Sequence, residues 1–172
     1  METTVKTLED QLAQYAAYHR DARNIFTHFF GIPLIVLAIA VLLSRPALDA
    51  GGLSISPALV LSLGVAVYYL RLDLSLGLLM SVLLALSVAF GHWAAVQPTG
   101  IWLAIGIGGF VAGWIIQFVG HWFEGRKPAF VDDIVGLIIG PLFVAVELLF
   151  KLGLLKPLQQ EIDRRAGPVR QK

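Results

Sequence analysis

The chain has 172 residues, of which 57% are hydrophobic and only 15% charged, and its mean hydropathy is +0.76. Soluble domains carry about 25% charged residues, so this composition indicates a membrane protein. The net charge of +1, without a Lys/Arg run interleaved with aromatics, argues against nucleic-acid binding. The absence of cysteine excludes disulfides, thiolate metal sites and a cysteine nucleophile.

The first 24 residues are polar and mixed in charge, unlike a signal peptide, so we expect the chain to insert through internal helices. Within this segment Leu8, Leu12, Tyr15 and His19 recur at helical spacing. They predict an amphipathic helix that lies on the cytoplasmic surface of the membrane and leads into the first span.

Long stretches free of Asp, Glu, Lys and Arg follow, and the Pro-Gly-containing turn "VQPTG" at 96–100 divides the longest of them. A membrane-spanning helix needs about 20 residues. The stretches therefore predict four spans, at roughly 25–43, 54–71, 74–95 and 101–121.

The fifth apolar stretch, 134–150, contains Gly140-Pro141 near its middle and also Glu147. Cytoplasmic loops are enriched in Lys and Arg. With four spans, one side of the membrane carries six basic residues and the other only Arg45, and a full fifth crossing would move the basic tail to the poor side. We therefore favour a broken or re-entrant fifth segment, although membranes also tolerate kinked spanning helices. The six residues are Lys6, Arg20, Arg23, Arg71, Arg126 and Lys127.

The fold class predicted is all-α: a polytopic membrane helix bundle of four transmembrane helices, the fifth segment and the N-terminal amphipathic helix. The length predicts a single membrane domain, 1–172, made of an amphipathic segment (1–24), a bundle (25–155) and a polar tail (156–172) that we expect to fray. Both termini should be cytoplasmic, in a bacterial inner membrane, or at the endoplasmic reticulum of a eukaryote.

Gly109 and Gly113 form a small-xxx-small pair on the fourth predicted span. Such a pair permits close helix contact and hence a homodimer. Small residues that fill gaps inside a single bundle explain the pair at least equally well.

Three of the four histidines gather at the predicted cytoplasmic edge: His19 and His28 at the entry of the first span, and His121 at the exit of the fourth. Polar residues at membrane depth are costly and usually face the bundle interior. His92 lies toward the opposite end of the third span beside Trp93, and we interpret it as an interfacial residue outside the site.

His19 and His28 are nine positions apart, about 900° of helix at roughly 100° per residue. On one straight helix they would point in opposite directions. Both reach a common site only if the chain breaks between them, and Asn24, four residues before His28, is the residue we expect to cap the first span there.

Around His121 the sequence adds an amide and a carboxylate, because Gln117, His121 and Glu124 can share one helical face. Imidazoles and a carboxylate without thiolate suit Fe(II), Zn(II) or Mn(II), and non-haem Fe(II) oxygenases use such a set with open positions. On spacing alone, an ordinary hydrogen-bond network explains these residues more simply than a metal.

The stretches "YHRDARNIFTHFFGIPL" and, far downstream, "QFVGHWFEGRKPAFVDD" resemble, in sequence and order, the membrane 2-hydroxy fatty acid dioxygenase family. The resemblance implies Fe(II)-dependent α-oxidation, in which a 2-hydroxy fatty acid and O2 give an acid one carbon shorter. It implies iron ligation by His19, His28 and His121.

The same resemblance implies that Glu124 is a fourth ligand or a base beside the metal, supported by Asn24 and Gln117. A 2-hydroxy fatty acid has its head at the membrane surface and its tail in lipid, so a metal at this edge would meet the head. The substrate carboxylate could be received by one of three basic residues, Arg20, Arg23 or Arg126.

Two other function classes fit the composition. A transporter or proton-conducting protein could use the same histidines together with Glu147, since ionisable residues in membranes also mark relays. Against this, the polar residues gather at one face instead of lining a path across. A purely structural membrane scaffold is the third interpretation.

Overall fold

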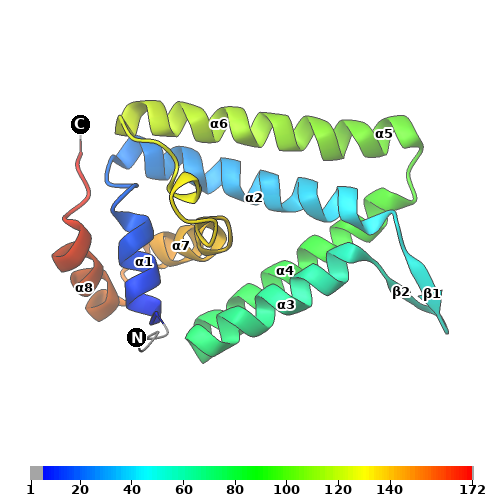
Figure 1. Ribbon diagram of the computed structural model, residues 1–172, viewed down its shortest axis with the longest axis horizontal. Coiled ribbons are helices and arrows are strands. Elements are labelled where there is room, and N and C mark those ends of the chain that lie inside the picture. The colour runs from blue at the N-terminus through cyan, green and yellow to red at the C-terminus, as the bar shows by residue number, and fades with distance from the viewer. Residues whose placement is uncertain (1–5, 172) are drawn as a thin grey trace. The chain divides into compact units, whose positions relative to one another are not determined.

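The computed structural model describes residues 6–171, and these are almost entirely helical (Figure 1). They form two compact units, one of residues 6–32 with 116–171 and the other of residues 33–115. The elements are α1 (Leu8–Ala16), α2 (Ala22–Ser44), β1 (Leu48–Ala50), β2 (Leu53–Ile55), α3 (Pro57–Leu72), α4 (Leu74–Ala95), α5 (Thr99–Leu103), a π-helical turn η1 (Ala104–Gly108), α6 (Gly109–Glu124), a 3-10 turn η2 (Ala129–Val131), α7 (Gly136–Lys151) and α8 (Lys156–Ala166).

Four helical segments lie where the sequence predicts spans, which confirms the all-α architecture. Three of them are long and apolar enough to cross a membrane: Ala22–Ser44, Leu74–Ala95 and the continuous stretch Thr99–Glu124. The fourth, α3, has 16 residues and is shorter than a usual span. Length and composition thus support crossing for three of the four predicted helices.

The second unit is built around the α3–α4 hairpin, whose hinge is Asp73. Its backbone N–H closes α3 on the Tyr69 carbonyl, and its carboxylate caps α4 by accepting from Leu76 N at 2.7 Å. A β-hairpin that was not among the predicted elements precedes α3, and it turns through Gly51 and Gly52 at φ of 66° and 89°.

Gly109 belongs to the same unit and lies against α2. A Cβ at this position would stand 3.4 Å from the Ala38 side chain and 3.5 Å from that of Leu34. This contact within one chain accounts for a small residue at 109. A homodimer through Gly109 and Gly113 stays a prediction.

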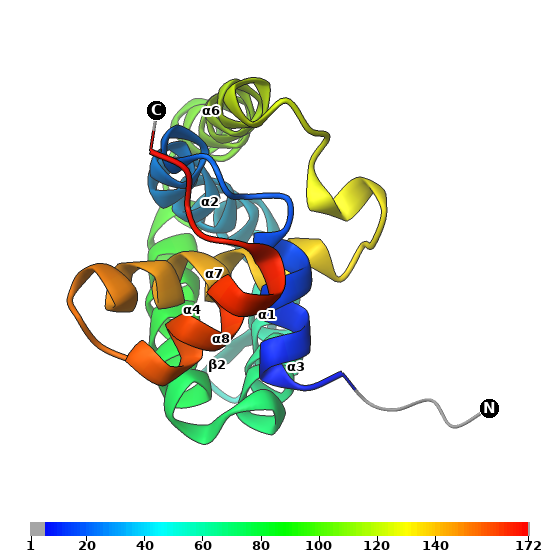
Figure 2. The same cartoon turned by 90° about the vertical axis from the view of Figure 1, so that its left-hand side faces the viewer.

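In the first unit, α1 is the predicted amphipathic helix. Thr7 and Asp10 form a capping box at its start, and its apolar side, including the fully buried Leu12 and Ala16, packs against α7 and α8 (Figure 2). The apolar face of α1 is therefore covered by protein.

The fifth apolar segment is bent, as expected, but α7 runs on through Pro141 and the bend falls at 152–155. There Gly153 and Leu155 adopt positive φ angles of 77° and 55°, and α8 leaves at 117° to α7. The prediction that the tail frays is wrong. Residues 156–166 form α8, and the residues beyond it pair with the start of α2.

Close packing at Gly77 generates a first prediction. A Cβ there would lie 2.6 Å from Leu70 Cα and 2.9 Å from the Tyr69 carbonyl carbon, so Gly77→Ala forces the hairpin backbones apart. We expect a loss of about 1–3 kcal/mol in thermal unfolding in detergent. The control is Gly64→Ala in α3, where nothing lies within 4 Å and alanine should be neutral or stabilising. Equal effects of the two substitutions would contradict this packing.

Candidate metal centre

The chain breaks between α1 and α2, as the spacing of His19 and His28 requires. His19 lies in the connection 17–21, whereas His28 lies on α2. The residue that caps α2 is Asp21, whose carboxylate accepts from Arg23 N at 2.9 Å. The prediction that Asn24 is the cap is therefore wrong, because Asn24 lies inside the helix.

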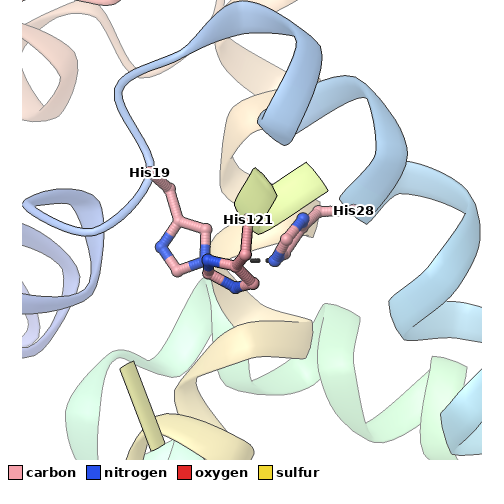
Figure 3. Close-up of side chains that lie close together, drawn as sticks. All are labelled: His19, His28 and His121. Atoms are coloured by element: carbon pink, nitrogen blue, oxygen red, sulfur yellow. Dashed lines mark hydrogen bonds between the residues drawn. The ribbon is translucent and has the colours of Figure 1, made fainter. Parts of the chain in front are cut away.

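The break brings His19, His28 and His121 together, and Figure 3 shows their rings converging. Each ring offers one nitrogen that lies within 4.8 Å of those of the other two. His19 Nε2 and His28 Nε2 lie 3.1 Å apart. All three side chains are buried, with exposed fractions of 0%, 1% and 7%.

The partners of the other ring nitrogens fix the orientation of two histidines. His19 Nδ1 donates to the Tyr15 carbonyl and His28 Nδ1 to the Asn24 carbonyl, both at 2.8 Å. A carbonyl oxygen only accepts, so both Nδ1 atoms carry the proton and both Nε2 atoms of the neutral rings present a lone pair. Burial lowers the pKa of His19 well below its usual range, aided by the neighbouring His28, and favours the neutral ring.

Two lone pairs that face each other at 3.1 Å repel unless a cation lies between them. Two ligands at right angles on a metal with bonds of about 2.1 Å stand about 3 Å apart, which matches this spacing. Among the described residues, the buried His121 Nδ1 has no hydrogen-bond partner. Three imidazoles, two of them held by carbonyl acceptors on the far nitrogen, fit a divalent ion such as Fe(II), Zn(II) or Mn(II).

Glu124 lies next to this cluster and is already hydrogen-bonded by three donors. Its carboxylate accepts from Asp21 N at 2.7 Å, from the Asn24 amide at 3.1 Å and from the Arg170 guanidinium at 2.6 Å. It therefore ties the start of α2 to the end of α6 and to the C-terminal tail. Asn24 acts twice, since its carbonyl orients His28 and its amide holds Glu124.

Four of the five buried polar side-chain atoms without a partner, counted over residues 6–171, belong to predicted site residues. Both amide atoms of Gln117 and Oδ1 of Asn24 are among them, with His121 Nδ1, while the fifth is the Ser44 hydroxyl. An unsatisfied buried polar group costs about 1–3 kcal/mol. Such atoms around a histidine cluster are suited to hydrogen bonds with a polar ligand.

The three basic residues expected near a substrate carboxylate all have partners within the protein. Arg20 is buried and pairs with Glu147 at 3.4 Å and with Asp163 at 3.1 Å. The other two donate to groups of the connection that carries His19: Arg23 to the Asp21 carboxylate and Arg126 to the Ala17 carbonyl.

His92 belongs to the other unit, where its Nε2 lies 3.1 Å from Ser56 Oγ, and it is not part of the three-histidine group. Sequence reasoning missed Tyr15, Asp21 and Arg170. Asp21 was open to detection, because aspartate directly before a helical stretch is a strong capping signal. Arg170 carries no such local signal.

The long apolar helices indicate a membrane protein, and the buried histidine cluster has the spacing of a candidate metal centre. Residues 5–152 match the family described as 2-hydroxy-palmitic acid dioxygenase Mpo1-like, and the chain belongs to this family. It is 35% identical over 159 residues to the 2-hydroxy-palmitic acid dioxygenase MPO1 of Saccharomyces cerevisiae, an alignment covering 91% of this chain and 87% of the relative. No solved structure matches. The family expected from the two sequence blocks is confirmed.

The Asp21 cap generates a pH prediction. Hydrogen bonds from the Arg23 side chain are the main cause that lowers the pKa of Asp21 to about 2, below the ~3.9 of an unfolded chain. Because the pKa of Asp21 is lower in the folded protein than in the unfolded chain, the Asp21 charge stabilises the fold fully above about pH 4. This stabilisation is lost as the pH falls toward about 2. Asp21→Asn keeps an oxygen for the cap but lacks the charge.

Wild type should therefore exceed the Asp21→Asn variant in Tm at about pH 7, and the difference should shrink below about pH 4. Thermal unfolding in detergent over this range measures it. Glu9→Gln, in the first turn of α1, is the control for removing one negative charge. A pH-independent difference would show that the Asp21 charge contributes nothing.

Proposed function

We propose that the protein is an Fe(II)-dependent dioxygenase that shortens 2-hydroxy fatty acids by one carbon, with His19, His28 and His121 as the metal ligands. The observation that carries the proposal is the 3.1 Å approach of two unprotonated Nε2 atoms beside a third buried imidazole. The substrate class is supported by the similarity to the yeast relative, a 2-hydroxy-palmitic acid dioxygenase.

The overall reaction balances as RCH(OH)COOH + O2 → RCOOH + CO2 + H2O. The C1–C2 bond breaks, C2 is oxidised to the new carboxyl group, and O2 is reduced. A bound Fe(II) would supply the electron transfer that lets O2 react with the 2-hydroxy acid. Three protein ligands would leave coordination positions of the ion open.

The protein's own polar atoms would orient the head of the substrate. The Gln117 amide, buried and without a partner among the described residues, offers a donor and an acceptor one helical turn before His121. Asn24 Oδ1 offers a second acceptor. We propose that these atoms bind the 2-hydroxyl and carboxyl groups, while Glu124 holds the start of α2 and receives or returns a proton.

The location of the cluster suits an amphiphilic substrate. His28 is in the first turns of α2 and His121 in the last turn of α6, so the metal would lie at the membrane edge where a fatty acid head resides. A transporter or proton relay is less favoured, because Glu147 faces the Arg20 guanidinium and is not placed as a free relay group.

We further propose that both termini lie on the cytoplasmic side. Arg170 contacts Asp21 at the start of α2 and Glu124 at the end of α6, so the chain that leaves α6 returns to the same end of these two helices. The chain from the end of α6 to Arg170 therefore starts and ends on one side of the membrane, so it cannot cross the membrane once. This supports a re-entrant or interfacial α7–α8 pair, in a bacterial inner membrane or an endoplasmic reticulum.

His121→Ala should lose bound iron and turnover together, because one of three ligands is removed. The measurement is iron per folded monomer, after size-exclusion in detergent, with analysis of the acid formed from 2-hydroxypalmitate. His92→Ala is the matched control and should keep iron and most activity. Full iron with normal turnover in the His121 variant would end the proposal, and full iron without turnover would make His121 an acid or base.

The topology is tested with reporter fusions at residue 172 and at the 96–100 turn. We expect the C-terminal fusion to report the cytoplasm and the turn fusion the opposite side. A C-terminal fusion that reports the outside would refute the non-crossing α7–α8 pair.

A further inference from the structure

The residues after α8 form a strap across the connection that carries His19. Gly167, with φ of 84°, ends α8, and its carbonyl accepts from Arg20 Nη1 at 2.8 Å. Further along, Arg170 N donates to the Arg20 carbonyl at 2.6 Å, and the Arg170 carbonyl accepts from Ala22 N at 3.1 Å. Residues 167–170 are called the strap below, and Figure 2 shows this red segment passing the start of α2.

The Arg170 side chain forms an ion pair in addition to these backbone contacts. Its guanidinium, half exposed, reaches the Glu124 carboxylate at 2.6 Å, and that carboxylate is 1% exposed. The other oxygen of Glu124 accepts from Asp21 N. The backbone carbonyl of residue 20 and the N–H groups of residues 21 and 22 are therefore held by the strap or by a side chain that the strap holds.

This arrangement matters because His19 differs from the other two candidate ligands. His28 and His121 are fixed by their helices, whereas His19 lies in an irregular connection. A ligand on a loop keeps its geometry only through supporting contacts, and loss of such contacts typically costs 10–100-fold in metal affinity. We propose that Arg170 is a positioning residue that sets His19 in the metal centre. The proposal rests on the proposed function.

The strap also lies outside the stretch that matches the family, which ends at residue 152. Its contacts nevertheless go to the first of the two sequence blocks that carry the family resemblance, at Arg20, Asp21 and Ala22. A second ion pair of the same tail allows a comparison with the Arg170–Glu124 pair. Arg165 pairs with Asp10 at 2.8 Å and so joins α8 to α1, without contacting the connection that carries His19.

The experiment compares full-length wild type with three variants: Arg170→Ala, Arg170→Lys and the control Arg165→Ala. Two readouts are taken in detergent: the Kd for Co(II) with the visible spectrum of the bound ion, and amide hydrogen exchange of residues 17–22 without metal. We expect Arg170→Ala to raise Kd by about 10–100-fold, to alter the Co(II) spectrum and to speed exchange. Arg170→Lys should recover part of both effects, and Arg165→Ala should match wild type.

The outcomes separate the two proposals. If wild type binds Co(II) and Arg170→Ala binds it equally well, or Arg165→Ala weakens binding as much, the positioning role is overturned while the metal site stands. If wild type binds neither Co(II) nor Fe(II), the proposed function fails. Amide hydrogen exchange then decides whether Arg170 positions the His19 connection. Faster exchange at 17–22 in Arg170→Ala alone supports a strap that positions His19, and unchanged exchange overturns it.

Discussion

The structure of the site depends on one constraint: two neutral imidazoles present unprotonated Nε2 atoms to each other at 3.1 Å inside a buried cluster. The carbonyl oxygens of Tyr15 and Asn24 impose this state, because each takes the proton-bearing nitrogen of one ring. Burial of His19 works against an extra proton. A metal ion would relieve the repulsion without requiring either ring to change its partner.

Several features of the first unit bring the His19 and His28 rings together. The break at 17–21 frees His19 from the helical direction of His28, and Tyr15 stacks on the His19 ring with centroids 4.1 Å apart. Across from it, Gly120 lets α6 approach α2, since a Cβ there would collide with Thr27 and Asn24. Small residues thus matter here for the distance between two helices that each carry one of the clustered histidines.

Most of the helices could be predicted from the sequence, because long uncharged apolar stretches indicate membrane-spanning helices. The break between His19 and His28 could also be predicted, because nine residues on one straight helix would point the two side chains in opposite directions. The cap was assigned wrongly, because Asn24 and Asp21 are both good capping residues. Asp21, which stands directly before the helical stretch, carried the stronger signal, and its hydrogen bond with Arg23 N identifies it as the cap. The polar tail was misjudged for a different reason. Composition describes its solubility, but its order comes from pairing with residues about 150 positions earlier in the chain.

The role of Glu124 was hard to assign from spacing, because its partners are also distant in sequence. On a helical wheel it shares a face with His121 and looks like a fourth ligand, yet its two oxygens accept from Asp21, Asn24 and Arg170. A carboxylate engaged in this way contributes most by holding the elements that carry the imidazoles. Among residues 6–171, the unpartnered buried polar atoms near the cluster belong to Gln117, Asn24 and His121, so the hydrogen bonds available to a polar ligand lie on the helices, beside the histidines.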